Sequence, residues 1–209
     1  MRGSLPVAEP FTTLTSIAAP LLRDNIDTDA MIPSREMKST GKTGLAGGLF
    51  AGWRYLDAAA RTPDPDFVLN QPQFSAATLL LCGRNFGCGS SREHAVWALA
   101  EYGIRCIIAQ SFAPIFQSNC VRNGIVPVVL PPEVIAQLAG QAVEVDLAAQ
   151  TVSADGGVWS FEIEGEAKAM LLEGLDAIDL TFKHREAIAA FQTADRAKRP
   201  WVYLEQNHA

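Results

Sequence analysis

The chain has 209 residues, of which 48% are hydrophobic and 19% charged, and this composition is sufficient to bury one sizeable core. The formal net charge is −6 and the basic residues are scattered singly, which argues against a nucleic-acid or anionic-membrane partner, because such surfaces attract clusters of Lys and Arg. No apolar run reaches the length of a membrane span or of a secretory leader, so we expect a cytoplasmic protein.

The first third of the chain carries turn signals and no long helical period. Residues 1–77 are rich in proline and include the glycine-rich stretches "GKTG" (41–44) and "AGG" (46–48). Proline and glycine interrupt regular elements. We therefore expect a loop-rich segment with short strands here.

From Ala77 onwards the hydrophobic pattern predicts strands that alternate with helices. The predicted strands are "ATLLLCG" (77–83), "RCIIAQ" (105–110) and "GIVPVVL" (124–130). The predicted helices are 91–102, 113–119 and one that begins at the proline pair 131–132. Such alternation is typical of a layered α/β core.

After Gly140 the pattern changes to short strands and then to a helix. "AVEVDL" (142–147) and "VWSFEIE" (158–164) are strand candidates with the turn "ADGG" between them. Residues 176–194 have a helical pattern and belong to a tail that we place at about 166–209. We therefore expect residues 1–209 to form a single domain with a C-terminal helical tail.

The stretch "GRNFGCGSSREHAVWAL" (83–99) contains the densest group of reactive and flexible residues. Ser90 and Glu93 have the spacing of a capping box at a helix start. Gly87 and Gly89 carry no side chains in the segment that leads into the predicted helix. A ligand could therefore come close to the backbone amides at the helix N-terminus. Arg92 has the wrong sign for that end of the helix dipole, so we expect it to hold an anion.

Other chemistry is weakly supported in this stretch. It has neither a G-K-[ST] phosphate loop nor the G-x-G-x-x-G dinucleotide spacing. Cys88 and His94 could form a nucleophile and base, but their separation puts them on different faces of a helix, and no third orienting group is evident. His94 is expected to be structural. None of the four cysteines forms a C-x-x-C pair, which indicates reduced thiols.

A second polar stretch, "RDNIDTDAMIPSREMKSTGKTG" (23–44), combines acids with cations. Its aspartates do not follow the order of a calcium-binding loop, and a polar turn would explain them. A turn does not explain the three cations in the thirteen residues that follow Asp29: Arg35, Lys38 and Lys42. A polycarboxylate ligand would satisfy them.

Together, "DNIDTDAMIP" and "NFGCGSSREHA" resemble the aconitase superfamily, and within it the separate small subunits of bacterial 3-isopropylmalate dehydratases. The resemblance runs through nearly the whole chain, in the family's order and spacing. It includes "LFAGWRYLD", "PDFVLNQPQF", "IIAQSFAPIFQSNCVRNGIVPV" and "LLEGLDAIDLTF".

The resemblance implies a swivelling β/β/α domain that closes over the active site of a large subunit carrying a [4Fe-4S] cluster, the two forming a heterodimer. It also implies a hydro-lyase reaction that interconverts 2-isopropylmalate and 3-isopropylmalate in leucine biosynthesis, through dehydration to a cis-alkene and rehydration on the neighbouring carbon. This chain has no cysteine triplet of the spacing that a cluster needs. We therefore expect it to bind no metal and to be inactive alone.

By the family's motif, Ser90 is the base that removes the carbon-bound proton. A serine alkoxide is strong enough for this only if amides, a helix N-terminus and a guanidinium stabilise its charge, and all three are near Ser90 in the sequence. The motif assigns Ser91 and Arg92 to a substrate carboxylate, and Asp29 to the catalytic hydrogen-bond network. Further candidates for substrate binding are Thr28, Arg35 and Lys38.

The loop after "IP" departs from the family pattern. Isopropylmalate enzymes usually carry an apolar or aromatic residue where this chain has Glu36 and an uncharged one where it has Lys38. Either these two neutralise each other at the rim of the site, or Lys38 faces the substrate. Three alternatives stay open: a related diacid substrate such as citramalate, dimethylmalate or a homoaconitate-like acid, a non-catalytic module that holds an anion, and a purely structural subunit.

Overall fold

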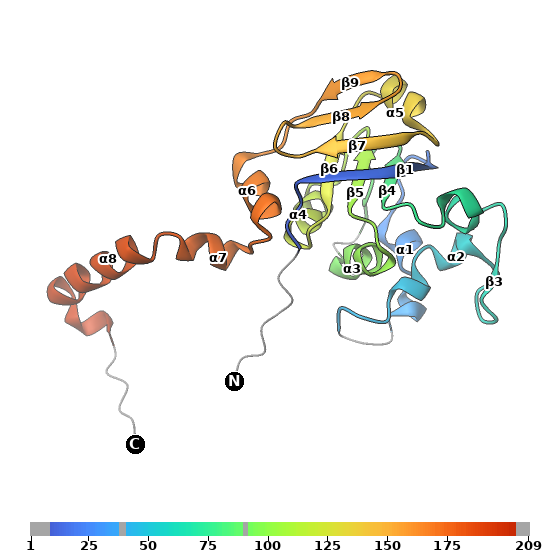
Figure 1. Ribbon diagram of the computed structural model, residues 1–209. Coiled ribbons are helices and arrows are strands. Elements are labelled where there is room, and N and C mark those ends of the chain that lie inside the picture. The colour runs from blue at the N-terminus through green and yellow to red at the C-terminus, as the bar shows by residue number, and fades with distance from the viewer. Residues whose placement is uncertain (1–8, 38–40, 90–91, 204–209) are drawn as a thin grey trace.

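A computed structural model describes residues 9–37, 41–89 and 92–203. Its framework is a seven-stranded sheet with the order β6-β5-β4-β1-β7-β8-β9 (Figure 1). The strands are β1 (Thr13–Leu21), β4 (Leu79–Cys82), β5 (Cys106–Ala109), β6 (Val126–Val129), β7 (Ala142–Asp146), β8 (Thr151–Ala154) and β9 (Gly157–Ser160). A two-stranded sheet pairs β2 (Tyr55–Asp57) with β3 (Thr62–Pro63).

Strand β1 joins the two halves of the large sheet. It pairs in parallel with β4, with Ala19 opposite Leu80, and antiparallel with β7, with Thr15 opposite Glu144. Strands β4, β5 and β6 are parallel to one another, whereas β7, β8 and β9 form an antiparallel meander. Figure 1 shows the sheet strongly curled, because β7–β9 run across the direction of β4–β6. The predicted α/β class is confirmed.

The helices lie mainly between the strands of the parallel half and after the meander. They are α1 (Thr28–Met31), α2 (Ala51–Arg54), α3 (Glu93–Tyr102), α4 (Pro114–Arg122), α5 (Pro132–Leu138), α6 (Gly165–Glu173), α7 (Ala177–Phe182) and α8 (Arg185–Lys198). Short 3-10 turns occur at Ser34–Glu36, Ala46–Gly48, Val68–Asn70, Pro72–Phe74 and Pro200–Val202. The predicted helix over 176–194 is divided in two, because α7 ends at Phe182 and α8 begins at Arg185.

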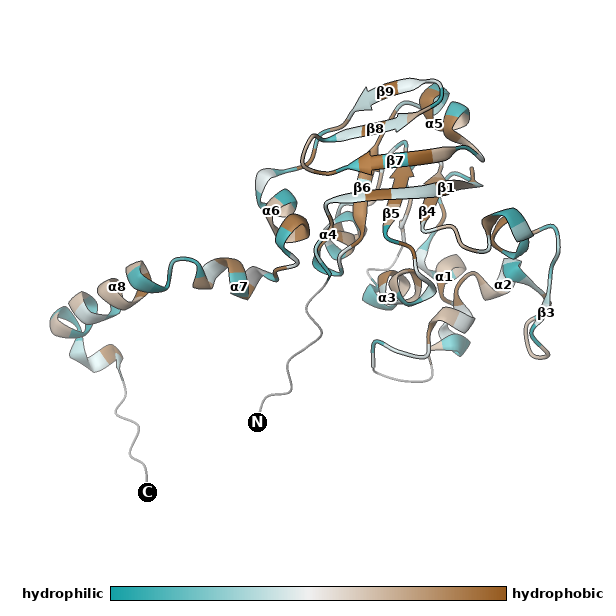
Figure 2. Cartoon of the chain, in the orientation of Figure 1, coloured by the Kyte–Doolittle hydropathy of each residue, from teal (hydrophilic) through white to brown (hydrophobic). Residues whose placement is uncertain are grey.

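The core lies on both faces of the parallel strands, which is why their sequences are almost continuously apolar. Leu80 of β4 and Ile107 of β5 face a cluster that includes residues of α1, α3 and α4. Their neighbours Leu79 and Ile108 face a second cluster, which includes residues of α5 and of the β7–β8 hairpin. Figure 2 shows this apolar centre in brown. The loops that follow β4 and β5 are thereby fixed at one edge of the sheet.

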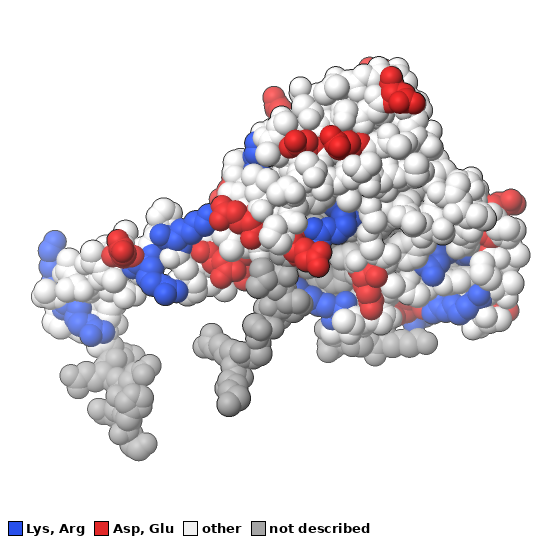
Figure 3. Space-filling model, viewed as in Figure 1, with Lys and Arg blue, Asp and Glu red and all other residues white. Residues whose placement is uncertain are grey.

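The C-terminal helices extend from the body as an arm. Figure 1 shows α7 and α8 leading away from α6, and no described residue of α8 is buried. Several large apolar side chains of the arm are exposed: Ile178, Phe182, Phe191, Trp201 and Val202. Figure 3 shows acidic and basic side chains interspersed along the arm. Within the described residues, no helix has both the length and the apolar content of a membrane span.

Candidate active site

The two motifs singled out in the sequence lie side by side at the edge of the parallel strands. The backbone N–H of Thr28 donates to the carbonyl of Cys88 at 3.1 Å, and that of Gly87 donates to the carbonyl of Ile26 at 2.8 Å. Asp27 caps α1, where its carboxylate accepts from the Ala30 amide at 2.7 Å. The polar 24–33 stretch is therefore joined directly to the glycine-rich loop.

The two glycines of this loop have packing and backbone roles. Gly87 and Gly89 have φ of +79° and +88°, a region that favours glycine. A Cβ at Gly87 would overlap the ring of Phe116, and one at Gly89 would lie 3.3 Å from the Cβ of Asp27. Both glycines line the hollow described below, and the missing side chain of Gly87 has the further role of making room for Phe116.

Asp29 and Arg92 form an ion pair between the two motifs. Arg92 Nη1 contacts Asp29 Oδ1 and also lies 3.4 Å from the hydroxyl of Ser34. The other guanidinium nitrogens of Arg92 make no hydrogen bond within the described residues. The ion pair with Asp29 fixes one side of the guanidinium. Because the Arg92 side chain is 28% exposed, the N–H groups on its other side remain available to a ligand.

The start of α3 differs from the sequence expectation. The helix begins at Glu93, and its N-cap is Arg92 in an extended conformation (φ −106°, ψ 107°). The capping box of Ser90 with Glu93 is therefore wrong, since Glu93 is the first residue of the helix rather than the third. Its carboxylate instead accepts a hydrogen bond from Asn123 Nδ2 at 3.1 Å. Three predicted site residues lie outside the described residues: Ser90, Ser91 and Lys38.

A hollow of about 220 Å³ opens beside this ion pair. Gly89 and Arg92, which flank the undescribed pair 90–91, both line it, and so does the buried Thr28. Its other wall is the first turns of α4, including Phe116 and Asn119. The structure thus places Thr28 and Arg92 on one small hollow, with Asp29 paired to Arg92, and Gly89, the residue before Ser90 in the chain, also lines this hollow.

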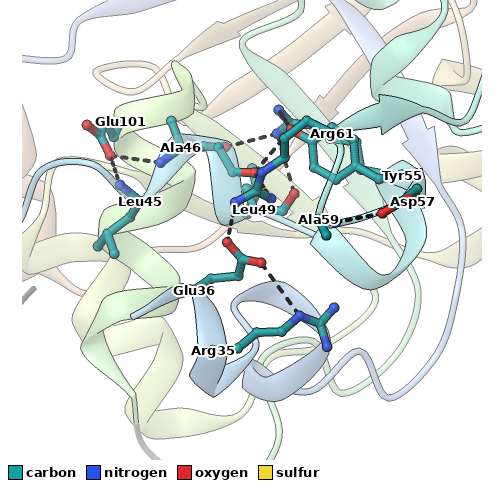
Figure 4. A network of polar contacts seen from close by, with 12 residues as sticks. Arg35, Glu36, Leu45, Ala46, Leu49, Tyr55, Asp57, Ala59, Arg61 and Glu101 are labelled. Carbon is teal, nitrogen blue, oxygen red and sulfur yellow. Dashed lines mark hydrogen bonds and ion pairs between the residues drawn. The ribbon is translucent and has the colours of Figure 1, made fainter. Parts of the chain in front are cut away.

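Arg35 and Glu36 lie apart from that hollow. Glu36 is buried, its carboxylate contacts Arg61, and Arg35 Nε lies 3.6 Å from it (Figure 4). Of the two alternatives for this loop, the one that puts Glu36 at the rim of the site, neutralised by Lys38, is wrong for Glu36, which is buried and paired with two arginines. Since Glu36 does not line the hollow, its charge is no argument against an apolar substituent on the substrate.

Glu101 is an anchoring residue that the sequence pattern did not indicate. Its carboxylate accepts hydrogen bonds from the backbone amides of Gly44, Leu45 and Ala46, at 2.6, 2.5 and 2.8 Å (Figure 4 shows part of this contact). Partial desolvation opposes ionisation, but these three amides outweigh it and lower the pKa of Glu101 below its usual range. Glu101 therefore holds residues 44–46 against α3.

The cysteines and histidine of this region show no catalytic arrangement. Cys82, Cys106 and Cys120 are fully buried, and burial raises the pKa of each thiol. The His94 ring packs against Trp97, with centroids 4.7 Å apart, as expected of a structural histidine. In the part of the chain that the structure describes, no group of three or more His, Cys, Asp or Glu could hold a metal ion.

Comparison with known proteins gives full-length relatives. The chain is 56% identical over 206 residues to a 3-isopropylmalate dehydratase small subunit of Cupriavidus necator, a match that covers 94% of this chain and 99% of the relative. It is 49% identical to the small subunit of that name from Agrobacterium fabrum, covering 93% and 100%. A crystal structure described as 3-isopropylmalate dehydratase, from Methanocaldococcus jannaschii, matches with a TM-score of 0.64 and 28% identity, covering 86% of this chain and 99% of that one.

Family models divide the chain at the end of the parallel half. The aconitase C-terminal domain matches residues 8–133, which contain both motifs of the site, and a model described as LeuD_N matches residues 134–165. The swivelling β/β/α fold expected from the motifs is thus confirmed by the family match and by the structural neighbour. The chain belongs to the family of 3-isopropylmalate dehydratase small subunits, within the aconitase superfamily.

Proposed function

We propose that this chain is the small subunit of a hydro-lyase that interconverts 2-isopropylmalate and 3-isopropylmalate, a step of leucine biosynthesis. The observation that carries the proposal is the Asp29–Arg92 pair, which brings the two family motifs together beside a hollow that Gly89 and Arg92 line. The names of its full-length relatives support the same activity.

In this proposal Ser90 is the base that takes the proton from the carbon beside a carboxylate. The groups that would stabilise its charge are the Arg92 guanidinium and the N-terminus of α3, which begins three residues later in the chain. Ser91 and Arg92 bind the substrate carboxylate, and Thr28 lines the same hollow. Asp29 orients Arg92 so that its remaining N–H groups are directed to the ligand.

Arg35 and Lys38 are proposed to contact the substrate from the 34–40 loop. The Arg35 side chain is 61% exposed and does not line the hollow in this chain alone. Its contact with the substrate therefore requires the closed complex, in which a second subunit faces this loop.

We place the iron–sulfur cluster, of the [4Fe-4S] type, on a large subunit. The described part of this chain does not fit such a group, since three of its cysteines are buried and no metal-ligating cluster is found there. On the large subunit, such a group would supply Lewis-acid chemistry for the loss of the substrate hydroxyl. This chain then acts in a cytoplasmic heterodimer, as one domain with its helical tail, binds neither nucleic acid nor membrane, and is inactive alone.

The test is coexpression with the candidate large subunit, anaerobic cluster reconstitution and a panel of hydroxy diacids. We expect turnover of isopropylmalate in preference to citramalate, dimethylmalate and homoaconitate-like acids. Ser90→Ala should lower kcat by at least about 100-fold, the scale of a lost proton-transfer group. Ser118→Ala, an exposed serine on α4, serves as the control and should leave kcat unchanged.

Two results would overturn this proposal. Full turnover by Ser90→Ala would remove Ser90 from the chemistry and leave a purely structural serine. Ligand binding without turnover by the reconstituted wild-type heterodimer would favour a non-catalytic anion-binding module. A preference for another diacid would keep the reaction type and change the substrate.

A further inference from the structure

Asn119 is a buried polar residue that lines the hollow. It is 8% exposed, and its side-chain amide makes no hydrogen bond within the described residues. The amide atoms of Asn119 are not among the fully enclosed polar atoms that lack a partner, so they open onto the hollow, and a polar group there gains by meeting a ligand or water. Such a side chain facing a hollow is suited to a bound ligand.

The beginning of α4 provides further donors beside Asn119. The helix runs from Pro114 to Arg122 without a side-chain cap, and the amides of Ile115 and Phe116 make no hydrogen bond within the described residues. Asn119 lies four residues after Ile115 and three after Phe116, so it shares their face of the helix. Side chains on a helix lean toward its N-terminus. The Asn119 amide and the positive end of α4 therefore border the same hollow.

The opposite wall indicates the class of ligand. Arg92, held by Asp29, keeps guanidinium donors that no described residue uses. A guanidinium, an amide NH2 and a helix N-terminus together favour a carboxylate. Pro114, Ile115 and Phe116 add apolar surface, which suits the hydrocarbon part of a small acid.

We propose that Asn119 is a substrate-binding residue, whose side-chain NH2 donates a hydrogen bond to a carboxylate oxygen of the substrate in this hollow. The inference rests on the proposed function, because it assumes a diacid substrate. It assigns a role to α4, which contributes no residue to the motifs that carry the proposed chemistry.

The test compares Asn119→Leu with Asn119→Asp in the reconstituted heterodimer, measuring kcat and KM for 3-isopropylmalate and the melting temperature. Leu keeps the volume and removes the amide, so KM should rise roughly ten- to a hundredfold, the effect of losing a hydrogen bond to a charged group. The melting temperature should stay equal or rise, since the amide that is removed makes no hydrogen bond within the described residues. Asp should raise KM further, because a second negative charge then faces the carboxylate.

Gln117→Leu is the matched control, because it makes the same change two residues earlier on α4, where the side chain lines a different hollow. It should leave KM unchanged. If KM also stays unchanged in Asn119→Leu, the proposal is overturned and Asn119 is a structural residue. If Leu weakens binding but Asp restores it, the contact is to the substrate hydroxyl and the carboxylate assignment is wrong. Failure of the proposed function itself would show separately, as absence of turnover in the wild-type heterodimer.

Discussion

The ring of Phe116 occupies the space that a side chain at Gly87 would need. Phe116 is 3% exposed and lies edge-on to Phe86, with centroids 5.3 Å apart. The glycine-rich loop after β4 is thus seated directly on α4, and the shape of the hollow depends on this contact. Gly87 also has positive φ, so both packing and backbone conformation require glycine.

Gly87→Ala should therefore destabilise the protein and impair the site together. We expect the free energy of unfolding to fall by about 2–4 kcal/mol, from the left-handed backbone and the displaced ring. Chemical denaturation of this chain and kcat/KM of the heterodimer measure the two effects. Gly52→Ala is the control, because a Cβ there meets nothing within 4 Å, and it should be neutral or slightly stabilising. Unchanged stability in Gly87→Ala would contradict the packing argument.

Arg92→Lys should weaken substrate binding while leaving the fold intact. A guanidinium can contact Asp29 with one nitrogen and donate two parallel N–H groups to a substrate carboxylate with the others. The ammonium group of lysine cannot do both. We expect KM to rise about tenfold or more. Stability should change by less than about 1 kcal/mol, because Asp29 is 56% exposed and exposed pairs contribute little.

The matched control for Arg92 is Arg84→Lys, which changes another arginine paired with an aspartate, Asp24, at 3.4 Å. Arg84 does not line the hollow, so the KM of the Arg84→Lys variant should equal that of the wild type. Equal KM values for the two lysine variants would place Arg92 outside the substrate site.

The regular α/β half was predictable from the sequence, and the first third was not. Every residue of β4 and β5 is buried, as are all residues of β6 except Val129, so their apolar runs are unmistakable. Strand β1 was missed as a long strand, because its sequence "TLTSIAAPL" is neither a continuous apolar run nor a regular alternation and contains Pro20, although it is central in the sheet. Strand β8 was missed because its four residues include only one that is buried.

The site residues that belong to a sequence motif were predictable. The residues whose role depends on a contact with a part of the chain distant in sequence were not. Arg92 and Asp29 were identified separately, and only the fold shows that they pair. Asn119 lies on a helix predicted from its apolar spacing, and no local signal marks an amide that opens onto the hollow. Glu36 was interpreted from its loop alone, whereas its partner Arg61 comes from the end of the 55–63 hairpin.

Arg61→Met should destabilise the fold without changing substrate preference. Among the described residues, it leaves the buried Glu36 carboxylate with Arg35 as its ion-pair partner, at 3.6 Å. Breaking a fully buried pair costs about 3–5 kcal/mol, and because Arg61 is 38% exposed we expect a smaller loss, about 1–3 kcal/mol. Glu36→Gln should cost less, since it leaves no buried charge. Denaturant unfolding and the diacid panel test this, and a changed substrate preference in Glu36→Gln would contradict the position assigned to Glu36.

The Glu101 contact should make stability depend on pH in the acid range. Its pKa in the folded protein is lowered from 4.5 by the amides of residues 44–46, so the ionised carboxylate is stabilised by folding. This contribution is fully present above about pH 4.5 and is lost as the pH falls through the lowered folded-state pKa. Glu101→Gln should therefore melt below the wild type at pH 7, and the difference should shrink toward zero near pH 3. Glu144→Gln, an exposed carboxylate on β7, is the control. A melting difference for Glu101→Gln that stays constant from pH 7 to pH 3 would show that the ionised carboxylate does not anchor this loop.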